Sequence, residues 1–557
     1  MVGKDRPGGS RMVLAGLGWF VSVGGEENLN SPSVCAGLRN RRRTDRQGGG
    51  ALHERRASHH MEKSTMKGLK LASAVVACGL FFVSPVWASG DQSAKVLEDP
   101  GAYAEVVALL EREVGSQLTR HLQERGELRH VSVSIHLNAK ARSMVISFGP
   151  GYLPGPDRGY DELFLIPMAS SLRFYAEKSG LIVNDIDFLF DGRTLEEYYP
   201  EDLAVPPQAR ARSTHTSALV SASHGYISLH PSREWKFQRP APLGIQEDTL
   251  SPLFGDELQA LMEQRSGLTV HRARSRSTEL HPESGKPWEH MSSRYHLKAL
   301  FPERTDMWNE FPNSPESARE KEEDIRARPN YANHLGVDVM LSLHTNGSDS
   351  ASLRGTEVYY HQDKPQDKAL ADSILCGMRE IIRAQPGYRD FPIRESSTSA
   401  RHGENRIGKM PSVIIETAYH SNPDDVAALQ DPVFRSASMK GVEKGYRLWA
   451  QGKACEPLML HPIPDVEVPL QAVRELTVGF AGNPQYPLEL EVVVADCDRP
   501  GYCTPWKGRF EDPDAPVKFG VSCSSTEPGS VRWNVLMRDA DDVVAAPVAF
   551  TQSCVRA

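Results

Sequence analysis

Two histidines and one glutamate lie beside hydrophobic segments, where folding could bring their side chains together. His224 follows an apolar segment, and Glu247 precedes a segment with helical spacing. His344 ends the apolar part of VDVMLSLHTNG, residues 337–347. Two imidazoles and one carboxylate can bind zinc and leave the fourth tetrahedral position open to water, as in catalytic sites. We therefore predict that these three residues bind a catalytic Zn²⁺.

Each of these residues also has an ordinary structural explanation when it is taken alone. His224 could belong to a surface turn, and Glu247 could be a helix-start carboxylate that complements the helix dipole. A polar residue such as His344 is also common at the end of a strand. The metal prediction therefore depends on the three residues together.

Hydrolysis at such a site needs a carboxylate outside the metal shell, which takes a proton from water and returns it to the leaving nitrogen. Glu416 is the candidate because it lies in the strongly apolar segment SVIIET, residues 412–417. Burying a carboxylate without a partner is costly, so its presence there needs a reason. We expect Glu416 to act as the general base.

The elements that must position these side chains follow from hydrophobic periodicity. Apolar segments predict strands at 217–222, 267–270, 337–344, 355–360 and 412–417. Amphipathic spacing predicts helices at 249–265, 324–334, 367–384 and 432–450. The alternation favours an α/β domain over residues 215–452, with a mostly parallel twisted sheet and helices on both faces. In such sheets ligands bind beyond the carboxyl ends of the strands, where His344 would lie.

Two further domains are expected on either side, since 557 residues suffice for about three domains. Residues 95–205 alternate between helical and strand patterns and predict a small α/β domain. Residues 455–557 contain β-rich segments separated by Pro, Gly and Asp, which predicts a β-sandwich-like domain. For this last domain, a packing role and a wall-binding role both remain open.

The cysteines favour an oxidising compartment, because six of the eight follow Ala88 and five of them crowd the C-terminal fifth. Six cysteines allow fifteen pairings, and sequence alone does not choose among them. Our hypothesis pairs Cys497 with Cys503 and Cys523 with Cys554. Cys376 could pair with Cys455 or remain a buried thiol.

The first 88 residues contain a predicted targeting signal. Residues 1–65 are rich in Gly, Arg and Ser, and we expect a mis-annotated or disordered extension. Residues 66–88 have a basic start, an apolar core and a small-residue cleavage pattern, which predict a secretory signal peptide too short to span a membrane as a helix. Translation would then begin at Met66 or Met61, and the protein would cross the inner membrane to act in the periplasm or outside the cell.

The net charge of the chain bears on which classes of partner it can bind. The formal net charge is −8, and the first 65 residues carry an excess of cationic residues, so the remainder is more acidic still. An acidic surface argues against nucleic acid or an anionic membrane as partner. An anionic polymer would have to be held by specific contacts.

Two segments carry motifs in a characteristic order. Residues 328–360 contain Arg-x-x-x-Ala-Asn, then Ser-x-His-x-Asn ending a strand, then Gly-x-Glu-Val-Tyr-Tyr. Residues 411–429 contain Pro-Ser-Val, a glutamate and a Ser-Asn turn. Over roughly residues 217–449 the chain resembles the zinc-dependent N-acetylmuramoyl-L-alanine amidases, which cut stem peptides from peptidoglycan. It departs from them at His224, which Gly-Tyr follows instead of Gly-Gly, and in a long insertion at 272–323.

The resemblance implies an enzyme that hydrolyses the amide between N-acetylmuramic acid and L-alanine, with His344 as a zinc ligand and Glu416 as the general base. A zinc carboxypeptidase or endopeptidase acting on the stem peptide is an alternative, and so is an inactive wall-binding protein. The polar segment 272–323 could be a lid that a regulatory protein partner moves. If so, deleting residues 277–315 should raise basal activity.

Overall fold

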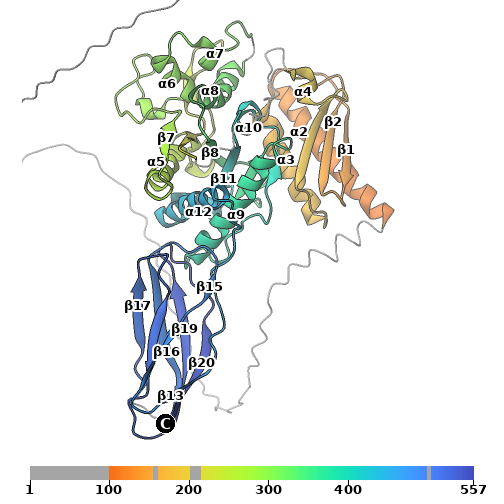
Figure 1. Ribbon diagram of the computed structural model, residues 1–557. Coiled ribbons are helices and arrows are strands. Elements are labelled where there is room, and N and C mark those ends of the chain that lie inside the picture. The colour runs from red at the N-terminus through yellow and green to blue at the C-terminus, as the bar shows by residue number, and fades with distance from the viewer. Residues whose placement is uncertain (1–98, 155–160, 201–214, 316, 499–502, 557) are drawn as a thin grey trace, which may run out of the picture. The chain divides into compact units, whose positions relative to one another are not determined.

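The computed structural model describes residues 99–154, 161–200, 215–315, 317–498 and 503–556 (Figure 1). The predicted extension 1–65 and the predicted signal peptide 66–88 lie outside these residues. Among the helices of the described ranges, none combines the length and the apolar character that crossing a membrane requires.

A nine-stranded sheet forms the framework of the site. Its strands lie in the order β1-β2-β3-β10-β9-β11-β8-β4-β7. Most neighbours are parallel, and only the β1–β2 and β9–β11 pairs are antiparallel. The predicted α/β class with a mostly parallel sheet is thus confirmed. The strand bounds are β1 Val133–Asn138, β2 Ser143–Phe148, β3 Asp185–Phe190, β4 Ser217–Ala222, β7 Thr269–Arg272, β8 Val339–Asn346, β9 Glu357–Tyr360, β10 Thr398–Ser399 and β11 Ser412–Tyr419.

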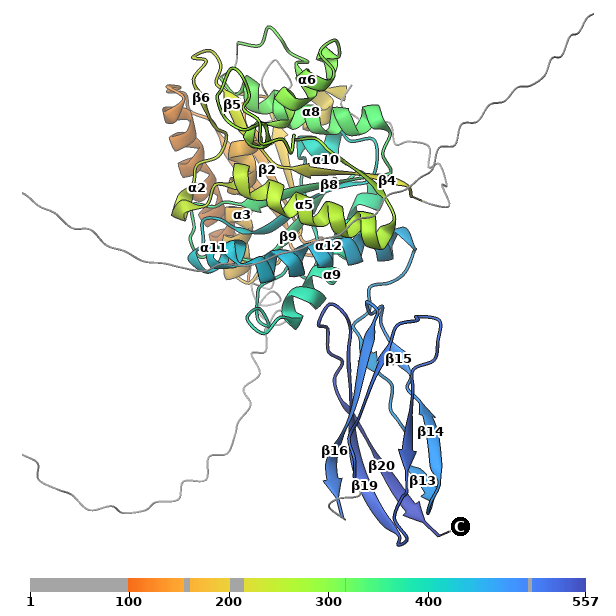
Figure 2. The same ribbon diagram turned by 90° about the vertical axis from the view of Figure 1, so that its left-hand side faces the viewer.

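Helices cover both faces of the central strands, so β8 and β11 are buried along their whole length. Alternate residues such as Leu341 and Leu343 pack toward the helices α5 (Glu247–Ser266), α9 (Pro365–Ala384) and α12 (Pro432–Ala450). Figure 2 shows α5 and α12 running side by side across the sheet. Met340 faces the opposite side, toward α6 (Ser293–Leu300) and α8 (Arg319–Leu335). Burial on both faces explains why the sequences of these strands are continuously apolar.

The N-terminal region adds strands to the same sheet. Helices α2 (Pro100–Glu124) and α3 (Glu162–Lys178) pack on β1–β3 in a core of their own. Strand β10 joins the two regions, because Ser399 pairs with Asp185 of β3 while β10 also pairs with β9. The sequence predicts helices and strands in this region but not that the strands extend the central sheet.

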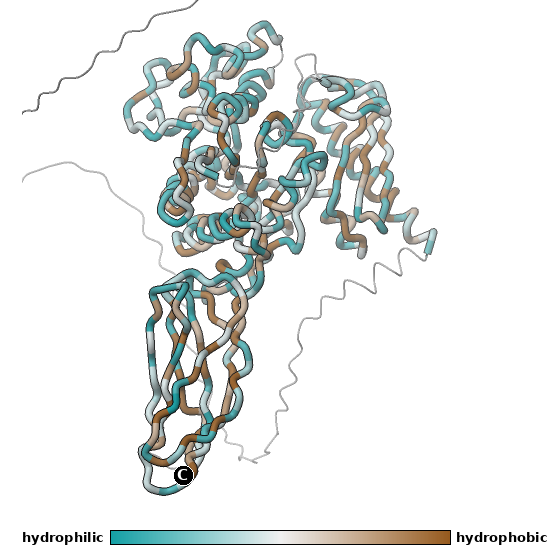
Figure 3. Tube along the Cα trace, viewed as in Figure 1, coloured by the Kyte–Doolittle hydropathy of each residue, from teal (hydrophilic) through white to brown (hydrophobic). Residues whose placement is uncertain are grey.

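The C-terminal region forms a five-stranded sheet in the order β13-β20-β19-β16-β17 and a β14–β18 pair. Hydrophobic residues alternate with polar ones along its strands (Figure 3). The predicted disulfides Cys497–Cys503 and Cys523–Cys554 are confirmed, and Cys376 pairs with Cys455. The bounds are β13 Val466–Pro469, β14 Val473–Thr477, β16 Leu488–Cys497, β17 Trp506–Phe510, β18 Lys518–Ser522, β19 Gly529–Arg538 and β20 Val548–Val555.

The polar segment 272–323 is more ordered than its composition predicts. It contains the helices α6 and α7 (Thr305–Trp308), and Leu297 and Met307 are buried against the sheet. Arg274 is fully enclosed, and its guanidinium donates to the carbonyls of Ser223 and Asp248. The segment therefore supports the turns beside His224 and Glu247, whether or not it also acts as a lid.

Candidate metal centre

The structure brings His224, Glu247 and His344 together. Each offers one ligand atom, and the three atoms lie within 4.8 Å of one another. Glu247 Oε1 is 3.4 Å from His224 Nε2 and 3.5 Å from His344 Nδ1. Ligands about 2.1 Å from a tetrahedral zinc ion are separated by about 3.4 Å. The spacing therefore fits the geometry of a zinc site.

The turn after β4 presents His224. Its φ of 54° lies in the left-handed region, which is uncommon for residues other than glycine and occurs often at functional sites. Gly225 follows with φ 130°, and a Cβ there would stand 2.6 Å from the backbone nitrogen of Ser292. Only glycine fits this close approach. The Gly225 N–H donates to Asp248 Oδ1 at 2.8 Å, which ties the turn to the start of α5.

Glu247 occupies the first position of α5, where a carboxylate complements the helix dipole. Its Oε1 accepts hydrogen bonds from the Ser223 hydroxyl and the Thr345 N–H, each at 3.0 Å. Its Oε2 is buried without a hydrogen-bond partner among the described residues. Burial opposes ionisation, but the facing histidines hold the pKa of Glu247 well below its usual range. Glu247 is thus an anchored anion whose second oxygen accepts no hydrogen bond from the described residues.

A carboxylate that the sequence analysis did not identify holds His344. The Nε2 of His344 donates to Glu404 Oε2 at 2.8 Å, and Glu404 Oε1 accepts from Arg328 Nη1 at 2.9 Å. This leaves Nδ1 of His344 facing Glu247. Burial would lower the pKa of His344, but the charge of Glu404 and hydrogen bonds to Glu247 and Glu404 raise it to about 10. Carboxylates that favour a proton on this imidazole also favour a divalent cation beside it.

Glu416 lies in the strand next to His344. In the register of β11 with β8, Glu416 is opposite His344, and on the other side it is opposite Glu357 of β9. Its Oε2 is buried without a hydrogen-bond partner among the described residues. Burial raises the pKa of Glu416 to about 8. A carboxyl group in this state can exchange a proton near neutral pH.

Arg239 lies against two of the three candidate ligands. Its Nε donates to His224 Nε2 at 2.9 Å and is 3.6 Å from Glu247 Oε2. The carboxylate of Glu247 and the two imidazoles nevertheless make a donor set that suits Zn²⁺. The residues present thus fit the metal that the sequence predicts.

Comparison with known proteins gives matches in this region. Residues 242–446 match the family model described as N-acetylmuramoyl-L-alanine amidase, so the match begins after His224. The N-acetylmuramoyl-L-alanine amidase LytC of Bacillus subtilis is 30% identical over 121 residues, which is 22% of this chain and 23% of LytC. The probable cell wall amidase LytH of Staphylococcus aureus is 24% identical over 112 residues, 20% of this chain and 35% of LytH. The chain thus spans about a quarter to a third of these curated relatives.

Solved structures of amidases align with the same part of the chain. The catalytic domain of CwlV from Bacillus (Paenibacillus) polymyxa var. colistinus is 19% identical, covering 41% of this chain and 95% of that one, with a TM-score of 0.28. AmiC2 of Nostoc punctiforme is 17% identical, covering 42% of this chain and 97% of that one, with a TM-score of 0.29. The match to the N-acetylmuramoyl-L-alanine amidase family thus extends over residues 242–446 of the chain.

Proposed function

We propose that this protein is a zinc-dependent hydrolase that cleaves the amide between the lactyl group of N-acetylmuramic acid and L-alanine in peptidoglycan. The observation that carries the proposal is the convergence of His224, Glu247 and His344 beside the buried Glu416, within an amidase-family domain. Peptidoglycan is the partner that this function implies.

The residues divide the chemistry between them. Zinc, when bound by His224, Glu247 and His344, would supply a Lewis acid that activates water and polarises the scissile carbonyl. Glu416 takes the proton of the attacking water and gives it to the leaving nitrogen of L-alanine. Burial raises the pKa of Glu416 to about 8 without a metal, and a cation held by the three ligands would lower it and favour the ionised carboxylate that accepts this proton.

We also propose that the protein acts in the periplasm or outside the cell. Three disulfides persist best in an oxidising compartment, which agrees with the signal peptide predicted at residues 66–88. A regulatory protein partner remains part of the proposal, with the segment 272–323 as the element on which it would act.

The decisive variant is Glu416→Gln, which removes the proton acceptor but keeps the shape of the side chain. We expect it to bind one zinc per chain and to lose hydrolysis of purified cell wall by at least about 100-fold. The matched control is Glu395→Gln, because that carboxylate is 84% exposed and outside the site. Metal analysis and mass spectrometry of the products give both readouts.

The products separate the alternatives. Free lactyl ends and new N-terminal L-alanine amines support the amidase, whereas cuts within the stem peptide indicate a peptidase. Hydrolysis by Glu416→Gln at the wild-type rate would refute the role of this residue. A pure protein that neither binds zinc nor hydrolyses cell wall would support a wall-binding protein instead.

A further inference from the structure

A third histidine lies next to the proposed metal centre, in addition to the two candidate ligands. His420 directly follows β11 and is only 7% exposed. Its Nδ1 is 4.0 Å from Oε2 of Glu247, the oxygen that accepts no hydrogen bond from the described residues. His420 is therefore close enough to act on a candidate ligand, although it does not belong to the group of three that could hold the metal.

An irregularity in β11 directs His420 toward the end of β8. Glu416 is opposite His344, but the next paired residue of β11 is Tyr419, opposite Asn346, so β11 advances by three residues while β8 advances by two. A bulge of this kind re-aims the side chains beside it, and bulges are frequent next to active sites. The N–H of His420 then donates to the carbonyl of Asn346 at 2.9 Å, which fixes the backbone of this histidine to β8.

Thr345 connects His420 to Glu247. Strand β4 ends at Ala222, which pairs with Leu343 of β8. The backbone N–H of Thr345 lies beyond this pairing, and it donates to Glu247 Oε1 at 3.0 Å. The hydroxyl of Thr345 is hydrogen-bonded to Nδ1 of His420 at 2.9 Å. One residue of β8 thus holds the carboxylate with its backbone and the imidazole with its side chain.

The ring of His420 also requires the glycine that follows β8. A Cβ at Gly347 would stand 2.7 Å from Nε2 of His420, which is closer than two such atoms can approach. Because the hydrogen bond to Thr345 and the surrounding burial hold the ring in place, any larger residue at this position would displace it. Gly347 and His420 are therefore a matched pair.

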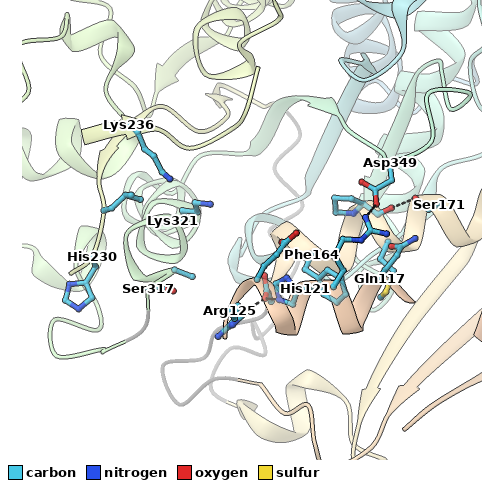
Figure 4. A pocket seen from close by; sticks show the side chains of 17 residues that line it. Gln117, His121, Arg125, Phe164, Ser171, His230, Lys236, Ser317, Lys321 and Asp349 are labelled. Atoms are coloured by element: carbon cyan, nitrogen blue, oxygen red, sulfur yellow. Dashed lines mark hydrogen bonds and ion pairs between the residues drawn. The ribbon is translucent and has the colours of Figure 1, made fainter. Parts of the chain in front are cut away.

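The loop after β8 is fixed on the side away from His420 as well. The N–H of Ser348 donates to the hydroxyl of Ser421 at 3.0 Å, and the Ser348 hydroxyl is 3.0 Å from that of Ser171 in α3. Figure 4 shows Ser171 of α3 and Asp349 of this loop next to each other. The loop is thus held between the N-terminal helices and the end of β11, which keeps it against the imidazole.

We propose that His420 is a positioning residue for Glu247, which it holds through Thr345. The hydrogen bond to the Thr345 side chain fixes the direction of the N–H that binds Glu247 Oε1. The imidazole also lies on the side of Oε2 and helps to enclose the carboxylate. Hydrogen bonds outside a metal site orient its ligands and raise the affinity for the metal. The proposal rests on the metal centre proposed above.

Zinc affinity, measured on the full secreted chain by competition with a chelator, tests the proposal. His420→Leu fills a similar volume but makes no hydrogen bond, so we expect zinc affinity to fall about ten- to a hundredfold. His420→Asn places a polar group near the position of Nδ1 and should recover most of this loss. The control His136→Leu changes an exposed histidine on β1 and should have no effect.

A second readout separates positioning from a general loss of structure. The visible absorption spectrum of the Co²⁺-substituted protein depends on the arrangement of the ligands, so His420→Leu should shift it and His420→Asn should restore it. Gly347→Ala displaces the ring and should also weaken zinc binding, whereas in the His420→Ala background it should add no further loss. Thermal unfolding of each metal-free variant shows whether the fold is intact.

Wild-type zinc affinity and an unchanged Co²⁺ spectrum in a folded His420→Leu protein would overturn the proposal. Equal losses in His420→Leu and His420→Asn would also overturn it, because the hydrogen bond would then not be the cause. The metal centre is judged separately on the wild-type chain. A wild-type chain that binds no zinc rejects the metal centre, whereas zinc binding that is insensitive to His420→Leu rejects only the role of His420.

Discussion

At the scale of single residues, the orientation of His344 is the feature that most needs support. An imidazole can face a metal with either nitrogen, and the hydrogen bond made by the other nitrogen decides which. Glu404 accepts from Nε2 and is itself held by the fully buried Arg328. Arg328 begins the Arg-x-x-x-Ala-Asn motif, so this motif supports His344 through Glu404. Glu404 is therefore a positioning residue for His344.

Glu404→Gln tests this role. The amide keeps the size of the side chain but loses the charge that orients the ring, so we expect zinc affinity to fall ten- to a hundredfold. Competition with a zinc chelator measures the affinity, and thermal unfolding of the metal-free protein shows whether the fold is intact. Glu395→Gln again serves as the control. Wild-type affinity in a folded Glu404→Gln protein would contradict the assignment.

At the scale of elements, a buried ion pair links α3 to β9. Arg173 of α3 is fully buried and pairs with Glu357 of β9, next to Glu416 in the sheet. Glu357 also accepts from Arg394 Nε and from the Tyr419 hydroxyl, both at 3.1 Å. Burial opposes its ionisation, but the two arginines outweigh burial and lower the pKa of Glu357 to about 2.

This pKa predicts how stability depends on pH. Because the folded-state pKa lies below the ordinary value of 4.5, the ionised carboxylate stabilises the fold above pH 4.5, and this contribution is lost as the pH falls toward 2. The full effect is about 3 kcal/mol. We expect Glu357→Gln to be less stable than wild type at pH 6, because Arg173 loses its partner, and to lose less stability on acidification. Urea unfolding at several pH values measures the free energy of unfolding of the wild type and of the variant. If this free energy falls equally in both proteins as the pH is lowered, ionised Glu357 does not contribute to stability.

The elements also show what the sequence can and cannot predict. Strands β4, β8 and β11 are predictable because burial on both faces requires continuous apolar residues. Strand β10 has only two polar residues, and helices α6 and α10 (Gly403–Ile407) lie in polar segments, so tertiary contacts fix them. Glu404 lies on α10, and no spacing in the sequence links it to His344. The candidate ligands were predictable from strand and helix ends, but their supporting carboxylate was not.

At the scale of the whole molecule, the N-terminal region and the domain with the candidate metal centre share buried interactions as well as a sheet. Arg401 pairs with Asp187 at 3.1 Å and with Glu196, and the Tyr360 hydroxyl donates to Asp185 at 2.9 Å. Arg173 also donates to Thr398 of β10 at 2.9 Å. A charged group enclosed at a junction is costly when its partner leaves, so separation of the two regions would expose several unpaired charges.

We therefore expect strands β1–β3 and the central strands β8 and β11 to open as one cooperative unit. We expect hydrogen exchange to measure the same free energy of opening for the most protected amides of β1–β3 and of β8 and β11. Arg173→Met should lower the protection of β1–β3 below that of β8, because the junction loses its central charge pair. Arg129→Met, which removes an arginine that is 50% exposed, should leave the two equal. If β1–β3 already exchange faster than β8 in the wild-type protein, the shared sheet does not couple the two regions.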